Sequence, residues 1–127
     1  MKEIIAIIRI NMINKTKEAL LNQGIYALHC SKVVGRGKKK VDLSFIEDIK
    51  NLEEINYGKF AGEIIENYRL SPRRMITVIV NDAEKDKAIK TIIDTNITGN
   101  PGDGKIFVCN IPEAVRIRTG EKNEEAL

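Results

Sequence analysis

Thr98–Val108 reads TGNPGDGKIFV, and the rest of the chain is organised around this stretch. Glycine adopts backbone angles that other residues avoid, so Gly102, Asp103 and Gly104 can turn their N–H groups toward a common point. Such a concave backbone binds anions, and Lys105 adds a positive charge beside it. The stretch is therefore either an anion-binding turn before a strand or a tight turn with surface charges. Its local chemistry leaves both open.

Two arginines follow the strand that this turn introduces. Arg116 and Arg118 belong to the segment RIRTGE, and alternation in an extended segment places both side chains on the same side. A guanidinium group matches the geometry of phosphate oxygens, so two arginines and a lysine near a glycine turn suit a polyphosphate. The alternative is a set of solvated surface charges.

The composition of residues 1–127 indicates a single compact, soluble domain. Hydrophobic residues make up 43% of the chain and charged residues 31%, whereas the net charge is only +3. Acidic and basic residues are mixed along the chain, which argues against a nucleic-acid-binding protein. No apolar run reaches the length of a membrane helix, and no secretory signal is evident. We therefore expect a cytoplasmic protein without a membrane partner.

The sequence offers little for metal or nucleophile chemistry. His29 is the single histidine, and the two cysteines, Cys30 and Cys109, lie far apart in apolar, strand-like segments. A zinc site needs more ligands than these residues provide. We therefore expect no metal site, no catalytic residues, and two small buried cysteines in a reducing compartment.

Hydrophobic periodicity predicts strands and helices in the order βαββαβ. The predicted strands cover residues 2–10, 26–34, 74–80 and 106–111; one helix covers residues 15–23, and a second carries Ala88, Ile89, Ile92 and Ile93 on one face. Asn14 and Asn81 are the expected N-caps, and Gly24 is expected to end the first helix. Right-handed crossovers place the first and third strands in the centre. The sequence thus predicts an α+β, ferredoxin-like domain with one four-stranded antiparallel sheet and two helices on one face.

A long connection over residues 38–72 joins the second and third predicted strands, and residues 112–127 form an extended C-terminal segment and tail. A connection of this length in a small domain usually binds a ligand or a partner. Lys38, Lys39 and Lys40 at its start are either a solvated charge run or a contact for phosphate or an oxoacid. The apolar residues of the connection either cover the sheet or bind a partner protein. They are Ile46, Ile49, Leu52, Ile55, Tyr57 and Phe60.

Taken together, these segments make the chain similar to the PII nitrogen-regulatory signal proteins. The resemblance rests on TGNPGDGKIFV, on RIRTGE and on Gly35-Arg36-Gly37 before the long connection, and it runs through nearly the whole chain. The chain looks most like the archaeal branch that regulates nitrogenase, of the second of its two paralogous types. The resemblance implies a barrel-shaped trimer with ATP or ADP in the clefts between subunits.

The resemblance also implies which residues contact the ligands. The nucleotide contacts fall on Gly35, Gly37, Lys38, Ile79, Gly102, Asp103, Gly104, Lys105, Arg116 and Arg118. The contacts for the effector 2-oxoglutarate fall on Lys39, Lys40 and Arg73. The family commonly has arginine and then glutamine where this chain has Lys38 and Lys39, and that glutamine helps to hold Mg²⁺ beside ATP. A lysine cannot coordinate Mg²⁺, although it can pair with a carboxylate of the oxoacid.

The expected function is that of a regulator and not of an enzyme. The resemblance implies a protein that responds to ATP, ADP and 2-oxoglutarate and regulates nitrogenase by binding a nitrogenase component protein through residues 38–72. A paralogous PII-like subunit is a second expected partner, in a homo- or hetero-oligomer built on trimers. Two alternatives stay open. One is a PII-like regulator of an ammonium transporter or a nitrogen-assimilation enzyme. The other is a small ferredoxin-like enzyme acting on a phosphorylated substrate, for which no general base or nucleophile can be named.

Overall fold

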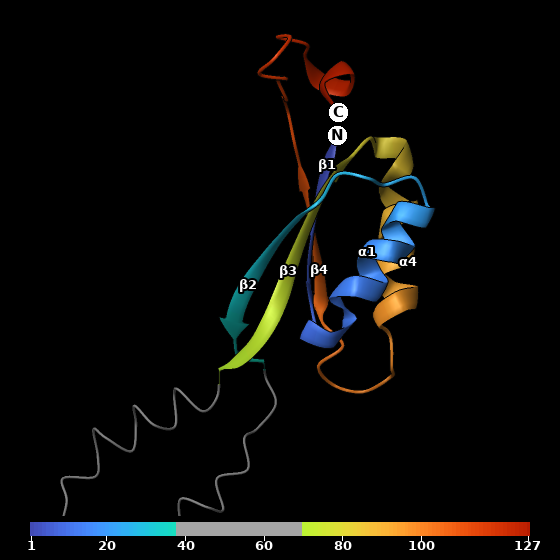
Figure 1. Ribbon diagram of the computed structural model, residues 1–127, viewed down its shortest axis with the longest axis vertical. Helices are drawn as coiled ribbons and strands as arrows, with labels where there is room; N and C mark the ends of the chain where they lie inside the picture. The colour runs from blue at the N-terminus through green and yellow to red at the C-terminus, as the bar shows by residue number, and fades with distance from the viewer. Residues whose placement is uncertain (38–69) are drawn as a thin grey trace, which may run out of the picture. The chain divides into compact units, whose positions relative to one another are not determined.

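The computed structural model describes residues 1–37 and 70–127, and Figure 1 shows their arrangement. Along the chain their regular elements are β1 (Lys2–Ile8), α1 (Ile13–Asn22), β2 (His29–Gly35), β3 (Ser71–Val80), α4 (Lys85–Asn96) and β4 (Lys105–Asn110). The contacts divide the chain into two compact units, residues 1–33 with 72–127 and residues 34–71. Neither α-helix of the described part is long and apolar enough to cross a membrane.

The four strands form one sheet in the order β2-β3-β1-β4. β1 pairs antiparallel with both of its neighbours, so that Ile4 lies opposite Val78 of β3 and Val108 of β4. The first and third strands of the chain are therefore central, as predicted. With two α-helices in the described residues, this arrangement confirms the predicted ferredoxin-like α+β fold.

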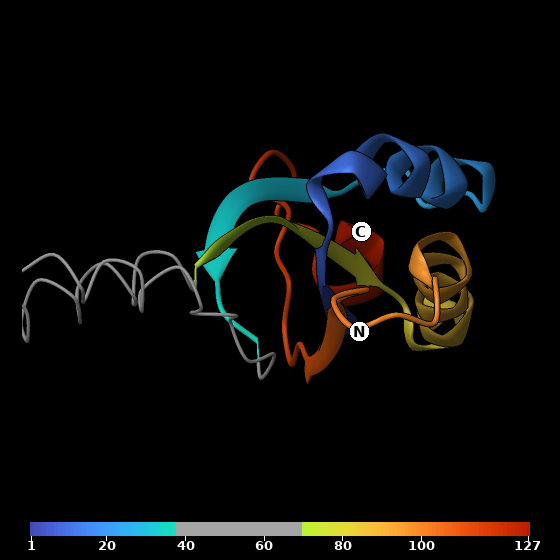
Figure 2. The ribbon, with the colours of Figure 1, turned by 90° about the horizontal axis from the view of Figure 1, so that it is seen from below.

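The hydrophobic core lies on one face of the sheet, and Figures 1 and 2 show α1 and α4 along that face. Side chains alternate along a strand, so every second residue of the two central strands points into the core. These strand residues are Ile4, Ala6, Ile8, Ile76, Val78 and Val80. Leu20 of α1 and Ile92 of α4 cover them and are themselves fully buried. Each large aliphatic side chain buried here stabilises the fold by about 1.5–3 kcal/mol.

The helix ends differ from the predicted ones in their capping. A 3-10 turn over Ile10–Met12 precedes α1, so the first strand ends earlier than expected and Asn14 lies inside the helix instead of capping it. Asn81 precedes a second 3-10 turn, and its side chain makes no capping hydrogen bond. Gly24 ends α1 as predicted. It has a φ of 81°, and its N–H donates to the carbonyl of Leu21 at 2.9 Å.

The edge strands are more exposed than the sequence suggested. His29, Cys30, Ser31 and Lys32 of β2 are all exposed. The prediction that both cysteines are buried is also wrong, because Cys30 and Cys109 are exposed free thiols. They lie on the two opposite edge strands, whereas the core cluster draws its strand residues mainly from the central pair.

The chain turns back on itself after β4. The N–H of Ile111 donates to the carbonyl of Met1 at 3.1 Å, and an antiparallel bridge then pairs Val115 with Lys122. Residues 117–119 form the turn between these two, and a 3-10 turn follows over Asn123–Ala126. We call residues 114–123 the C-terminal hairpin. The sequence predicted an extended segment through Arg116 and Arg118, and this turn interrupts it.

Candidate functional site

The chain between α4 and β4, residues 98–104, forms a tight loop that we call the glycine loop. Three of its residues have positive φ, namely Gly99 at 79°, Gly102 at 96° and Gly104 at 126°. Such angles strain any residue that carries a Cβ. At Gly104 the space is closed as well, because an added Cβ would lie 2.1 Å from the carbonyl oxygen of Ile7. Glycine is therefore required where the loop lies against the end of β1.

The side chain of Asp103 holds the glycine loop in shape. Its carboxylate accepts hydrogen bonds from the main-chain N–H of Thr98 at 2.8 Å, the N–H of Gly99 at 3.1 Å and the Thr98 hydroxyl at 2.5 Å. Arg9 Nη1 completes the set at 2.7 Å from Asp103 Oδ1. These bonds, the two from Thr98 foremost, lower the pKa of Asp103 from 3.8 to about 2, against an opposing desolvation. Asp103 therefore organises the loop and leaves little capacity for a ligand.

Two arginines contact the carbonyl groups of the loop: Arg9, which directly follows β1, and Arg73 of β3. Arg73 Nη1 donates to the carbonyl of Gly102 at 2.9 Å, and Arg9 Nη2 donates to that of Pro101 at 3.4 Å. A Cβ at Gly102 would lie 3.3 Å from Arg73 Nη2, so the missing side chain leaves room for this guanidinium. Arg9 was not recognised from the sequence. Its one signal was a lone charge near the end of an apolar run.

The loop keeps unused hydrogen-bond donors. Among the bonds of the described residues, none is donated by the main-chain N–H of Gly102, Asp103 or Gly104, and Lys105 has no ion pair. Main-chain amides without partners next to a lysine are the chemistry of an anion site. Arg73 adds positive charge, whereas the charge of Arg9 is offset by Asp103. Residues 102–105 with Arg9 and Arg73 thus form a compact group that suits a phosphate or a carboxylate.

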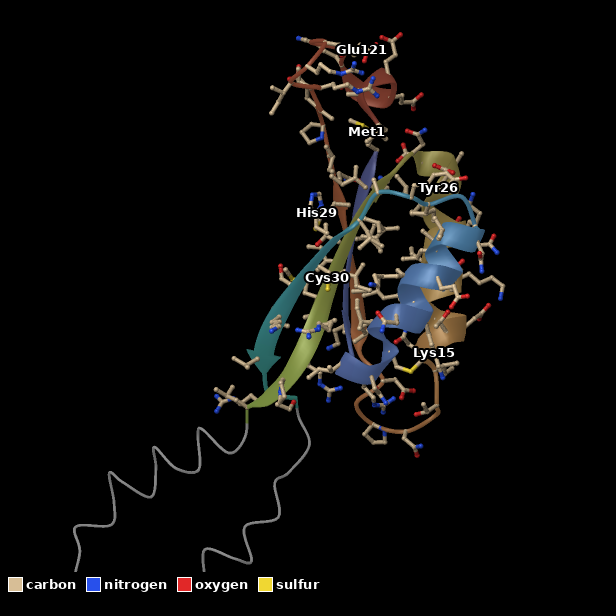
Figure 3. All side chains as sticks on the ribbon, viewed as in Figure 1. Met1, Lys15, Tyr26, His29, Cys30 and Glu121 are labelled. Atoms are coloured by element: carbon tan, nitrogen blue, oxygen red, sulfur yellow. The ribbon has the colours of Figure 1, made fainter. Side chains whose placement is uncertain are left out.

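The predicted phosphate arginines lie far from this group within one chain. Lys105 pairs with Ile7 near one end of β1, whereas the segment that leads to Arg116 and Arg118 starts beside Met1 at the other end. At about 3.4 Å per residue, the ends of the six-residue β4 lie about 17 Å apart. Figure 3 shows Glu121 of the C-terminal hairpin and Met1 toward the same end of the sheet, away from Lys15 in the first turn of α1.

Some of the remaining predicted site residues are described by the structure, and the others lie outside the described part of the chain. Ile79 of β3 lies opposite Glu3, toward the Met1 end of the sheet, and is 36% exposed. Gly35 ends β2 within the second unit, where its carbonyl accepts a hydrogen bond from the Ser71 hydroxyl at 3.2 Å. Among the described residues, an added Cβ would meet nothing within 4 Å at Gly35 or Gly37, so those residues by themselves do not require glycine there. Outside the described residues lie Lys38, Lys39, Lys40, Ile46, Ile49, Leu52, Ile55, Tyr57 and Phe60.

A pocket of about 240 Å³ lies beside the glycine loop, on the side of α4. Its walls are largely isoleucine side chains, and its full lining is Ile8, Ile92, Ile93, Asn96, Ile97, Asp103, Gly104, Lys105 and Ile106. Such walls do not suit an anion. In the described part of the chain, no three side chains of His, Cys, Asp or Glu gather to hold a metal ion.

Comparison with protein families places this geometry in context. Residues 1–121 match the family model described as nitrogen regulatory protein P-II. The match covers the glycine loop and most of the C-terminal hairpin.

Individual relatives agree with this match over the whole chain. The chain is 42% identical to the "nitrogen fixation nifHD region GlnB-like protein 2" of Methanobacterium ivanovii, covering 100% of this chain and 99% of that protein. It is 40% identical to the "nitrogen fixation nifHD1 region GlnB-like protein 2" of Methanosarcina barkeri, with the same coverage. The "nitrogen regulatory protein P-II 2" of Methanothermobacter thermautotrophicus is 35% identical, over 100% of this chain and 97% of that protein. The chain therefore belongs to the nitrogen regulatory protein P-II family.

Proposed function

We propose that this protein is a nitrogen-status regulator that binds ATP or ADP between two copies of the chain. The glycine loop of one copy and the C-terminal hairpin of the next copy would together hold the phosphates. The observation that carries the proposal is the set of unpartnered amides at residues 102–104, next to Lys105. Phosphate oxygens accept hydrogen bonds from such amides and pair with lysine and arginine.

The separation of the two cationic groups supports a site between copies. The two ends of β4 lead to different parts of the predicted phosphate set, and the extended strand holds those ends about 17 Å apart. One chain therefore does not bring Arg118 to its own Lys105. Head-to-tail contacts between copies close into rings, in which the hairpin of each copy can meet the loop of its neighbour. The face of the sheet opposite the core carries Ile79 and Phe107, which are 36% and 47% exposed, and it offers an apolar surface for such contacts. The trimer implied by the family resemblance is such a ring.

The positive charge of Arg73 beside the glycine loop also suits the carboxylates of the effector 2-oxoglutarate. We propose that 2-oxoglutarate binds near Arg73, because a carboxylate pairs with its guanidinium. The other two predicted contacts, Lys39 and Lys40, lie outside the described residues. Mg²⁺ would then reach the site mainly through phosphate oxygens of ATP. Asp103 is already committed to Thr98, Gly99 and Arg9, and lysine is not a metal ligand.

We further propose that the regulated process is nitrogen fixation, through direct binding to a nitrogenase component protein or through a mixed oligomer with a paralogous subunit. The names of two of the relatives refer to a nifHD region and to nitrogen fixation. The residues proposed to contact the target lie in 38–69, outside the described part of the chain. Another target, such as an ammonium transporter or a nitrogen-assimilation enzyme, is the second candidate. It is favoured by the relative whose name mentions only nitrogen regulation. In either case the protein would act by binding and not by catalysis.

A mixing experiment tests the shared site. Lys105→Ala and Arg118→Ala should each weaken ATP binding in isothermal titration calorimetry. When the two variants are co-expressed, about a quarter of the sites in random trimers should combine an intact loop with an intact hairpin and recover the affinity of the unmodified protein. The control is a mixture of Arg116→Ala with Arg118→Ala. Both changes lie in the hairpin, so no site is restored.

Each outcome of the mixing experiment has a distinct meaning. Recovery only in the loop–hairpin mixture supports a site between copies. Weak binding by both variants without recovery would place the site within one chain. If neither change at Lys105 nor at Arg118 weakened binding, the nucleotide proposal itself would be wrong.

A further inference from the structure

The C-terminal hairpin already contains an anion bound to one of its arginines. Arg116 Nη1 donates a hydrogen bond to Glu121 Oε2, and Arg116 Nη2 donates to the main-chain oxygen of Leu127 at 2.9 Å. The main chain brings these groups together, because the N–H of Arg116 donates to the carbonyl of Glu121 at 2.8 Å. The guanidinium that would meet a phosphate is therefore occupied by the chain itself.

Arg118 differs sharply from Arg116 although it is only two residues away. In the described part of the chain it has no ion pair and no hydrogen bond, and it lies in the turn of the hairpin. Glu121 by contrast is held twice, because the Thr119 hydroxyl also donates to its Oε2 at 2.7 Å. The two arginines that the sequence presented as equivalent are thus in different states, one unpartnered and one engaged by a carboxylate.

The contact between Arg116 and Glu121 is accessible enough to exchange. The two side chains are 34% and 41% exposed, so water can replace either partner. Ion pairs of this exposure contribute little to stability. A phosphate group carries more charge than a carboxylate and offers more acceptor oxygens to a guanidinium. Arg116 is therefore placed to change from Glu121 to a phosphate with a small cost.

We propose that Glu121 is an internal competitor that a nucleotide phosphate displaces from Arg116. The inference rests on the proposed function and adds a regulatory step to the same site. Arg116 also donates to Leu127, so a guanidinium that turns from Glu121 to a phosphate would break that hydrogen bond, loosen the 3-10 turn over Asn123–Ala126 and release the C-terminal tail. The conformation of the C-terminal tail would then depend on whether a nucleotide is bound. Arg118, which needs no such exchange, makes the first contact.

A matched pair of charge-neutralising variants tests the competition. Glu121→Gln keeps the shape of the side chain but removes its charge. Glu113→Gln removes one charge from the same region, where Glu113 Oε1 pairs with Lys122 Nζ at 3.2 Å. By calorimetry with ATP, Glu121→Gln should bind about two- to fivefold more tightly than the unmodified protein, the range expected for an exposed ion pair. Glu113→Gln should bind with unchanged affinity.

Three results would count against the competition. Weaker or equal binding by Glu121→Gln would mean that Glu121 positions Arg116 and does not compete for it. An equal gain in Glu113→Gln would reduce the effect to overall charge. No ATP binding by the unmodified protein would overturn the proposed function, and this inference with it.

Release of the tail provides a second readout that does not depend on affinity. In NMR spectra, ATP should shift the Leu127 methyl signals of the unmodified protein toward their positions in nucleotide-free Arg116→Ala, which lacks the hydrogen bond to Leu127. If ATP binds but leaves the Leu127 signals unmoved, the tail stays attached and the displacement of Glu121 is ruled out.

Discussion

Arg9 Nη1 lies 2.7 Å from Asp103 Oδ1, and this ion pair joins the end of β1 to the glycine loop. The two side chains are 26% and 25% exposed, so the pair is partly shielded from water. Arg9 also donates to the carbonyl of Pro101, two residues before Asp103. A single guanidinium thus holds both the acidic side chain and the backbone of the loop, and the shape of the candidate anion site depends on it.

The first prediction concerns the pH dependence of stability through Asp103. Its folded pKa of about 2 is lower than its ordinary value of 3.8, so its contribution to stability is fully present above pH 3.8 and is lost as the pH falls through about 2. Asp103→Asn should lower the free energy of unfolding at pH 7, and the deficit should shrink between about pH 4 and pH 2. Urea unfolding at several pH values measures this. Asp86→Asn, which removes an exposed carboxylate of α4, is the control. A deficit that does not change with pH would show that the charge of Asp103 does not stabilise the loop.

The second prediction concerns backbone conformation at the glycine loop. Gly104→Ala should destabilise the protein by about 3 kcal/mol or more, because the new Cβ would meet the Ile7 carbonyl in addition to the strain of its positive φ. Gly99 also has a positive φ, but a Cβ there would meet nothing within 4 Å. Gly99→Ala should therefore lower the free energy of unfolding by only about 1–2 kcal/mol. Thermal unfolding compares the two variants. Equal losses would mean that the close approach to Ile7 is not maintained.

The third prediction concerns the buried polar link between the helices. Asn96 Nδ2 donates to the Thr16 hydroxyl at 3.0 Å and to the Ile92 carbonyl at 2.9 Å, and Thr16 in turn donates to the carbonyl of Met12 at 2.8 Å. Asn96 Oδ1 has no partner in the described residues. In a double-mutant cycle of Thr16→Val and Asn96→Ala, the double variant should lose about 0.5–1.5 kcal/mol less than the sum of the single losses.

The control for this cycle pairs Asn96→Ala with Thr91→Val, whose hydroxyl bonds only within α4. That pair should be additive. Additivity in the Thr16 and Asn96 cycle would show that the link between the helices makes no net contribution.

The fourth prediction concerns nucleotide affinity. Lys105→Ala, Arg116→Ala and Arg118→Ala should each weaken ATP binding by about 1.5–3 kcal/mol, the scale of a charge-assisted hydrogen bond. Lys90→Ala removes a lysine that pairs with Asp94 on the exposed side of α4, and it should bind ATP normally. Calorimetry or a thermal-shift titration measures these differences. An equal loss in the Lys90 variant would point to a nonspecific charge effect.

The fifth prediction concerns the long connection that the sequence placed at residues 38–72. Deleting its middle should spare nucleotide binding and abolish binding to the nitrogenase component protein, because the proposed target contacts lie there. Co-purification of the deleted and complete proteins with that component compares them. A deletion variant that still binds the target would show that another surface makes the contact.

Much of the fold was predictable because it depends on local patterns. The apolar runs around Ile4 and Val78 and the helical spacing of Ala88 and Ile92 specify the strands and one helix, and these residues are buried in the structure. Capping was less predictable. Asn14 and Asn81 have the right side chains for a cap, but both helices begin through 3-10 turns whose first residues are set by the path of the chain.

The candidate site was only partly predictable. The glycines of the loop carry a clear signal, since their φ angles require the residue type. Asp103 was predicted as a nucleotide contact. Its carboxylate binds the loop itself, and among the described residues its main-chain N–H has no partner, so that contact stays a prediction for the backbone. Arg9 carried almost no signal, because its role depends on a contact with a residue far along the chain. The burial of Cys30 and Cys109 was wrong for a similar reason. An apolar neighbourhood in sequence does not reveal which strand lies at an edge.

The sequence by itself determined the order of the elements, the family, and the glycines that let the loop turn, because these follow from side-chain periodicity and from backbone freedom at single residues. Only the tertiary structure decided which charges meet. Pairing of β1 with β4 brings Arg9 to Asp103 and carries Arg116 to the opposite end of the sheet, where Glu121 binds it. Ion pairing depends on distance in space, and that distance is set by strand register and not by position along the chain.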